Sequence, residues 1–77
     1  MGGTVTSWLI TASNGDSPYL VHDDADVRVY LMSKVEGEQP RLNQPDFLYW
    51  IGQACRTPPL TFGPLPSGAV YQVEPVE

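Results

Sequence analysis

The chain has 77 residues, of which 42% are hydrophobic and 10% aromatic, a composition typical of folded rather than disordered proteins. At this length we expect one small domain over residues 1–77. Nine acidic against four basic side chains give a net charge of −5, which opposes binding to nucleic-acid phosphates and to anionic membrane surfaces. The single cysteine cannot form an internal disulfide, and the sequence shows no signal peptide or membrane span, so we expect a cytoplasmic protein.

The first 21 residues predict a β-hairpin. Residues 4–12 are rich in β-branched and aromatic side chains, which favour a half-buried strand. Asn14 and Gly15 follow directly, and because both residue types tolerate positive φ they favour a tight reversal into a second strand at residues 19–21. Pro18 has no amide proton to donate, so the second strand should begin after it or lie at a sheet edge.

Residues 23–37 fit either a helix or a strand. Asp23 or Asp24 can cap a helix, and Gly37 can end it. The apolar residues at helical spacing are Val27, Tyr30, Leu31 and Val35. Residues 27–32 also alternate with period two, as a half-buried strand would. We predict the helix and keep a strand over residues 27–33 as the alternative.

A second helix is predicted over residues 46–56. Asn43 can cap it, Pro45 suits its first turn, and the Thr-Pro-Pro sequence at 57–59 ends it. One apolar stripe of this helix consists of Phe47, Ile51 and Ala54 or Cys55. Tyr49 and Trp50 lie off this stripe, so they could face a partner.

The remaining residues predict a loop and a last strand. Residues 58–68 hold four prolines, which favour an extended loop that displays Leu60 and Phe62. Residues 69–73 predict a strand, with residues 74–77 as a charged tail after it. The expected fold class is therefore α+β: an antiparallel sheet of the N-terminal hairpin and the C-terminal strand, covered on one face by one or two helices. The element order is β-β-α-α-β, or β-β-β-α-β if residues 27–33 form a strand.

No cluster of residues indicates a metal or a cofactor. His22 precedes Asp23, Asp24 and Asp26, but this segment lacks the central glycine and distal glutamate of a calcium loop. Zinc would need more histidine or cysteine than the chain contains. We therefore expect the aspartates to cap and solvate the start of a helix, with no metal or cofactor bound.

The sequence also gives little support for catalysis. Cys55 and His22 form a nucleophile and base only if the fold brings them together. The last turn of a helix disfavours a thiolate, so we expect Cys55 to be packed and inert. The serines lack the G-x-S-x-G setting, and no glycine-rich phosphate loop is present. We predict no catalytic residues and a protein that is not an enzyme.

With metal binding and catalysis given little support, the sequence favours a surface that binds a protein partner. A charged rim, aromatic anchors and a stiff loop are the features of such interfaces. The candidate partner-binding residues are Asp23, Asp24, Asp26, Tyr49, Trp50, Leu60 and Phe62. The alternative is that the large apolar side chains among them complete the core, because a domain this small needs every one.

The leading hypothesis for function is a non-enzymatic acidic protein-binding module. In size and net charge alone, the chain resembles small phage-encoded inhibitors such as anti-CRISPR proteins and uracil-glycosylase inhibitors. That resemblance implies an inhibitor from a phage or mobile element, which blocks a basic or nucleic-acid-binding surface of a host protein. One alternative is a structural subunit of a homo-oligomer or virion, with a homodimer as its simplest form. Another is a small metal-binding protein or enzyme that uses His22, Asp23, Asp24 and Cys55.

Overall fold

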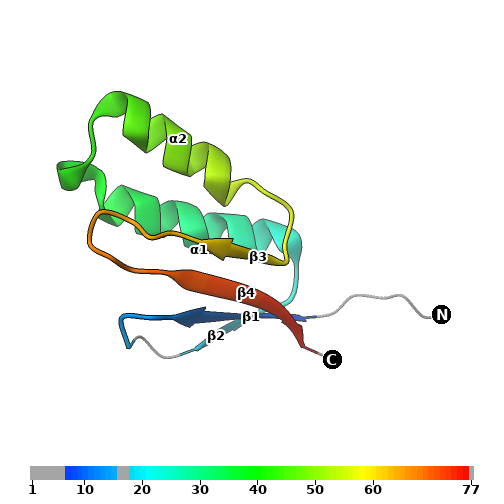
Figure 1. Cartoon of the computed structure of the whole chain (residues 1–77). Helices are drawn as coiled ribbons and strands as arrows, with labels where there is room; N and C mark the ends of the chain where they lie inside the picture. Colours follow the sequence, from blue (N-terminus) through cyan, green and yellow to red (C-terminus); the bar gives the residue numbers. More distant parts are fainter. Residues whose placement is uncertain (1–6, 16–17, 77) are drawn as a thin grey trace.

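The computed structural model describes residues 7–15 and 18–76, which form a four-stranded antiparallel sheet with two α-helices packed on one of its faces (Figure 1). In chain order the elements are β1 (Ser7–Ala12), β2 (Tyr19–Val21), α1 (Asp24–Gly37), the short 3₁₀ helix η1 (Gln39–Arg41), α2 (Gln44–Ala54), β3 (Leu60–Phe62) and β4 (Tyr71–Val76). This architecture confirms the α+β prediction.

The strand order in the sheet is β2-β1-β4-β3, and all neighbours are antiparallel. β1 and β4 form the centre, with Ser7 opposite Val76 and Ala12 opposite Tyr71. β2 and β3 are edge strands of three residues each. The first and last strands of the described chain are therefore direct neighbours, and the start of β1 lies beside the end of β4.

Helix α1 begins at a complete N-cap. The Asp23 carboxylate accepts hydrogen bonds from the backbone N–H groups of Ala25 (2.7 Å) and Asp26 (3.2 Å), two of the N–H groups that the start of a helix leaves without an acceptor four residues earlier within the helix. Val27, Leu31 and Val35 recur every fourth residue on the face turned to the sheet and are buried. The helix prediction for residues 23–37 is confirmed, and the strand alternative is wrong because period four, not period two, separates the buried residues.

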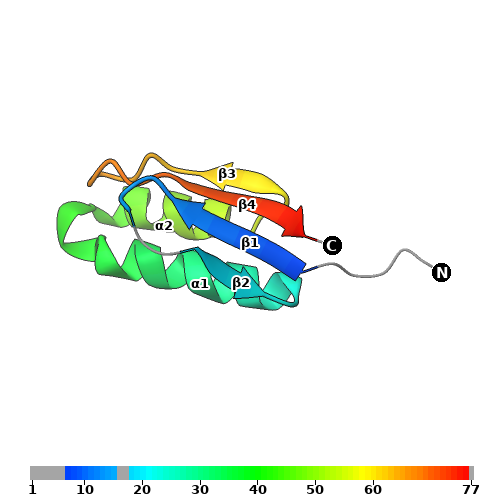
Figure 2. The same cartoon turned by 90° about the horizontal axis from the view of Figure 1, so that it is seen from below.

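Helix α2 has the predicted N-cap, but it begins and ends two residues earlier than the predicted range 46–56. The Asn43 side chain accepts a hydrogen bond from the Asp46 N–H (2.8 Å), and Pro45 occupies the first turn, where its missing amide proton leaves no helical acceptor unpaired. The helix ends at Ala54, with Cys55 as its C-cap. Figures 1 and 2 show α2 antiparallel to α1, with both helices on the same face of the sheet.

The core lies between the sheet and the helices. Its sheet side is made of alternate residues of the strands, which are Ile10, Val21, Leu60, Phe62, Tyr71 and Val73. Burying an aliphatic or phenyl side chain contributes about 1.5–3 kcal/mol each. The opposite face of the sheet has no second layer of described residues (Figure 2), and it carries exposed side chains such as Leu20, Gln72 and Glu74.

The structure corrects the predicted loop over residues 58–68. Leu60–Phe62 is strand β3, paired with β4 so that Leu60 lies opposite Val73 and Phe62 opposite Tyr71. The last strand also extends further than predicted, because residues 74–76 stay paired with β1 instead of forming a tail. Residues 4–6 of the predicted first strand lie outside the described residues.

The hairpin connection is longer than a tight turn. It spans residues 13–18, of which residues 16 and 17 lie outside the described part. Gly15 takes a positive φ of 93°, whereas Asn14 does not. Strand β2 begins directly after Pro18 and lies at the sheet edge, as the proline predicts.

Candidate functional site

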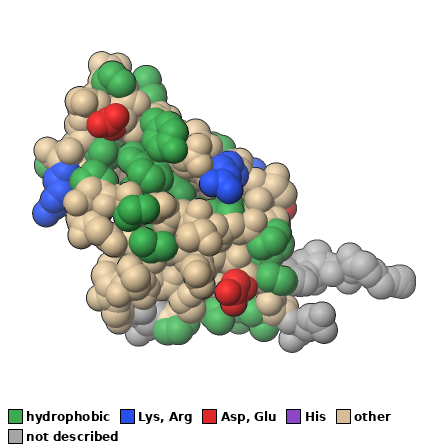
Figure 3. All heavy atoms as spheres, viewed as in Figure 1, with side chains coloured by type: hydrophobic (Ala, Val, Ile, Leu, Met, Phe, Trp, Pro, Cys, Tyr) green, Lys and Arg blue, Asp and Glu red, His purple; other side chains and the backbone are tan. Residues whose placement is uncertain are grey.

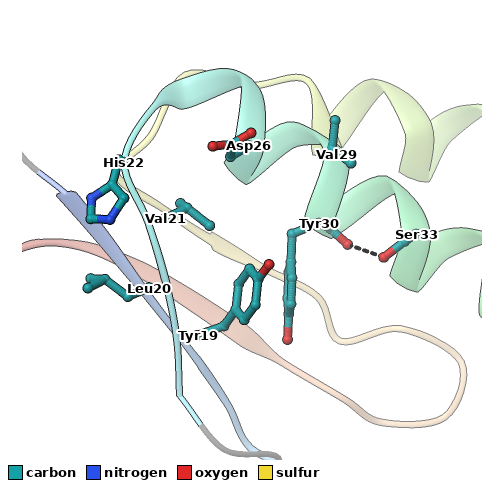
Figure 4. Close-up of a pocket in the computed structure, with 8 residues that line it drawn as sticks. All are labelled: Tyr19, Leu20, Val21, His22, Asp26, Val29, Tyr30 and Ser33. Atoms are coloured by element: carbon teal, nitrogen blue, oxygen red, sulfur yellow. Dashed lines mark hydrogen bonds between the residues drawn. The ribbon is translucent and has the colours of Figure 1, made fainter.

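A groove of about 370 Å³ lies between the edge strand β2 and helix α1 (Figure 4). One wall is the end of the hairpin, with Tyr19, Leu20, Val21 and His22. The other wall is one face of α1, with Asp26, Val29, Tyr30 and Ser33. These four positions have the spacing i, i+3, i+4 and i+7, which places them on one side of a helix. The groove therefore follows from an edge strand lying beside a helix.

Exposed apolar side chains gather at this groove. Tyr19, Leu20 and Val29 are 50%, 49% and 66% exposed. They are three of the five large hydrophobic side chains that are exposed in the described part of the chain. Tyr19 turns toward α1, whereas Leu20, the next residue of β2, lines the groove at its edge with its side chain directed away from the helix (Figure 4). Single exposed apolar residues are normal, whereas several around one concavity indicate a contact surface.

The tyrosines at the groove are held in place by ring contacts. The Tyr19 ring stacks on the Tyr30 ring, with centroids 4.8 Å apart and planes at 22° (Figure 4). The Tyr30 ring in turn meets the buried Tyr71 ring edge-on at 6.2 Å. The Lys34 ammonium nitrogen lies 4.9 Å from the centroid of Tyr30, within cation–π distance. The exposed Tyr19 ring is thus held in one orientation by Tyr30, which itself contacts Tyr71 in the core.

The predicted acidic cluster divides into three different roles. Asp23 is the N-cap of α1, and Asp24 accepts a hydrogen bond from the Trp8 indole N–H at 2.8 Å. Asp26 lines the groove and is exposed. The negative charge of the groove wall therefore comes from Asp26, one turn before Val29 and Tyr30.

His22 contacts a serine that the sequence did not connect to it. The Ser7 hydroxyl oxygen lies 2.8 Å from His22 Nδ1, and the hydroxyl donates this bond when Nδ1 is unprotonated. A serine beside an imidazole is the first part of a nucleophile and base pair. A complete site also orients the base through its second nitrogen, and among the described residues no carboxylate bonds the His22 ring.

The structure does not join His22 to Cys55. Cys55 is exposed at the C-cap of α2, so the prediction of a packed cysteine is wrong: the residue lies one position beyond the last helical turn that contacts the core. Within the described residues, no group of three or more His, Cys, Asp or Glu side chains is placed to hold a metal ion. In the same part of the chain, every buried side-chain nitrogen or oxygen has a hydrogen-bond partner.

The two predicted aromatic anchors of α2, Tyr49 and Trp50, have different environments. Tyr49 is 57% exposed, next to Leu48 at 58%, on the outer side of α2. Trp50 is half-buried and meets Phe62 edge-on at 5.4 Å. In Figure 3 hydrophobic side chains gather over α2 in the upper part of the view.

Leu60 and Phe62 are not displayed at the surface. They are 8% and 1% exposed, because alternate residues of β3 face the helices while Thr61 between them faces solvent. The expectation of a loop that presents these two side chains is therefore wrong. Their apolar surface belongs to the core.

Comparison with protein-family models, curated proteins and solved structures gives no match for this chain. Neither described helix has the length and apolar character needed to cross a bilayer.

Proposed function

We propose that the chain is a non-enzymatic protein-binding module that contacts its partner through the groove between β2 and α1. The observation that carries this proposal is the exposed apolar surface around one concavity at a free sheet edge, where Tyr19 of β2 turns toward α1 and Val29 of α1 lies on the opposite wall. Aromatic and aliphatic side chains at the centre of a contact supply most of the binding free energy of protein interfaces. Asp26 adds a charge at the rim of the same groove.

The groove is ordered before a partner arrives. Tyr19 stacks on Tyr30, and Tyr30 contacts the buried Tyr71, so the exposed ring is already oriented. Ordering a side chain during association costs about 0.5–1.5 kcal/mol, and a ring that is already fixed avoids much of this cost. This arrangement supports a role for Tyr19 as an anchor.

The charge of the chain favours a basic partner. A net charge of −5 raises the association rate with a positive surface and lowers it with nucleic acid. In its finer form, the proposal is that the chain is a cytoplasmic inhibitor from a phage or mobile element. It would cover a basic or nucleic-acid-binding surface of a host protein.

The structure offers a matched pair of variants for the test. Adjacent Tyr and Leu side chains are similarly exposed at two places: Tyr19 and Leu20 on the strand that borders the groove, Tyr49 and Leu48 on α2. The immobilised chain is used to recover proteins from a lysate of the source cells. Each recovered protein is then purified, and its Kd is measured by titration calorimetry against the wild type, Tyr19→Ser/Leu20→Ser and Leu48→Ser/Tyr49→Ser. Circular dichroism melting curves first establish that both double variants are folded.

The groove variant should weaken the binding of a true partner at least about 10-fold, because it removes the Tyr19 ring from the groove together with the exposed Leu20 of the same edge strand, while the α2 variant stays within about 2-fold. Equal affinity for the wild type and the groove variant would contradict the proposed binding surface. The reverse pattern, with loss only in the α2 variant, would move the interface to Leu48 and Tyr49.

Self-association is a second candidate function, favoured by the uncovered face of the sheet. Leu9 lies opposite Leu20 on this face, at the junction of β1 and β2, and Leu20 is 49% exposed. A homodimer or larger assembly that packs these faces together would bury this pair. Sedimentation equilibrium over a wide concentration range tests it: a monomer throughout would exclude it, and assembly lost in a Leu9→Ser variant would support it.

A further inference from the structure

We propose that the groove takes an extended segment of the partner protein, which pairs with β2 as a fifth strand and places one basic side chain against Asp26. This inference rests on the proposed binding function and specifies the shape and chemistry of the partner. Three observations carry it: the free edge of β2, the spacing of the α1 side chains beside it and the distribution of charge along the groove.

The free edge supplies the backbone pairing. β2 pairs on one side with β1, through Trp8 opposite Val21 and Ile10 opposite Tyr19, and no described strand lies on its other side. In an antiparallel pair alternate residues direct their N–H and C=O groups away from the neighbour, where they can pair with a further strand. β2 has three residues. At about 3.4 Å per residue it matches a short extended segment.

The side chains of α1 that border the groove are spaced about as far apart as alternate residues of a strand. Asp26 and Tyr30 are four residues apart, which is about 6 Å along a helix axis. Alternate side chains of a strand are about 6.8 Å apart and point to the same side. Figure 4 shows the Asp26, Val29 and Tyr30 side chains along the helix that borders β2. A strand added to β2 can therefore place one side chain at Asp26 and the next on the same side at Val29 and Tyr30.

The charge along the groove is uneven. The Asp26 carboxylate lies at the end nearest the start of α1, where Asp24 is also exposed. The Lys34 ammonium lies at the far end, over the Tyr30 ring. The segment that fits this pattern carries a lysine or arginine at the Asp26 end and an apolar residue two positions away, toward Tyr30.

Charge also distinguishes this occupant from a second copy of the chain. Neither edge strand carries a basic side chain, since β2 is Tyr-Leu-Val and β3 is Leu-Thr-Phe. Edge-to-edge pairing of two copies would therefore leave Asp26 without a cation from the added strand. The groove suits a different protein that supplies one.

Selection from a displayed library of random octapeptides, with the full chain as bait, tests the chemistry of the occupant. We expect selected sequences to share a lysine or arginine at one position, with β-branched or aromatic residues at alternate positions. An Asp26→Lys bait should exchange the shared basic residue for aspartate or glutamate. An Asp46→Lys bait is the matched control, because Asp46 is an exposed acidic residue in the first turn of the other helix. That control should select the same peptides as the wild type.

A backbone N-methyl scan of one selected peptide tests the strand pairing. Methylation at alternate residues should weaken binding at least about 10-fold, because only every second N–H faces β2, and methylation between them should have little effect. Equal tolerance at all positions, or selection that is the same for the wild-type and Asp26→Lys baits, would overturn the inference.

The remaining outcomes separate this inference from the proposed function. Selected peptides that bind Tyr19→Ser/Leu20→Ser as well as the wild type do not use the groove, and they overturn the inference. The proposed function would survive that result if a whole partner protein still loses affinity for the same variant. A dimer that Tyr19→Ser alone abolishes in sedimentation, and that Leu9→Ser leaves intact, would also overturn the inference, with a second copy as the occupant.

Discussion

The carboxylate of Glu38 accepts hydrogen bonds from both the backbone N–H and the side-chain hydroxyl of Ser67, a residue 29 positions further along the chain. Glu38 follows α1 directly and is 8% exposed, the one buried charged residue in the described part of the chain. Ser67 lies in the turn that precedes β4. Glu38 therefore attaches the proline-rich segment to the helical layer.

Removing this carboxylate should cost a large share of the stability. Glu38→Ala is expected to lower the free energy of unfolding by about 1.5–3 kcal/mol, since it removes two hydrogen bonds to a charged and largely buried carboxylate, and Ser67→Ala by about 1 kcal/mol. Urea denaturation of both variants and of the double variant gives their coupling energy. Glu36→Ala, at an exposed position of α1, should change stability by less than about 0.5 kcal/mol. Equal losses for the two glutamate variants would contradict the role of the contact.

The hydrogen bond from Trp8 to Asp24 should contribute less, because it is exposed. A double-mutant cycle with Trp8→Phe and Asp24→Ala removes the indole donor, the carboxylate acceptor or both. We expect a coupling energy of about 0.5–1 kcal/mol between them. The cycle separates this bond from the favourable effect of an acidic residue in the first turn of α1. Strictly additive effects in urea denaturation would mean that the bond contributes nothing.

Substitution of Asp23 should change stability without changing binding, and substitution of Asp26 should do the reverse. Asp23→Ala removes the N-cap of α1 and should lower stability by about 1 kcal/mol with no change in partner affinity. Asp26→Asn removes a groove charge and should change stability by less than about 0.5 kcal/mol. Its association rate with a basic partner should fall several-fold at low salt, and the difference should shrink as salt screens the charge. Stopped-flow association at several salt concentrations measures this. Rates independent of salt would count against electrostatic steering.

Two glycines should respond in opposite directions to the same substitution. Gly63 has a φ of 121°, and a Cβ there would lie 2.5 Å from the Ala69 carbonyl oxygen. Gly63→Ala should therefore destabilise the fold by at least about 2 kcal/mol. Gly52 lies in α2 with open space around it, so Gly52→Ala should stabilise the fold by about 0.5–1 kcal/mol. Thermal melting of the two variants should shift to opposite sides of the wild type.

The sequence predicts best where the signal is local. Asp23 and Asn43 act as N-caps, and the buried stripe of α1 has the spacing expected from Val27, Leu31 and Val35. In each case the determining contacts are within a few residues. Local sequence signals were therefore sufficient to predict α1 and α2.

Strand β3 was missed because its partner is distant in the sequence. Leu60-Thr61-Phe62 is too short to show a clear alternation, and prolines surround it. Only its pairing with Tyr71–Val73 makes it a strand. The end of β4 was missed for a related reason. The pairing of β4 with β3 ends at Val73, so Pro75 has β1 on one side and no described neighbour on the other, where a proline is tolerated.

The groove was missed although part of its signal is present in the sequence. Val29 is an apolar residue off the buried stripe of α1, and Pro18 indicates that the following strand lies at an edge. Joining the two observations requires knowing that α1 packs beside β2. The display of Leu60 and Phe62 was predicted wrongly because residues 60–62 form a strand, in which these two alternate side chains both turn into the core.

The pairing of Ser7 with Val76 means that the polypeptide enters and leaves the sheet at one point. A fold with this arrangement can be spliced into a surface loop of a carrier such as a fluorescent reporter, because its two connections need to bridge only the spacing of adjacent strands, about 5 Å. New ends can then be opened in the hairpin between β1 and β2. The arrangement therefore suits this fold to insertion into another protein.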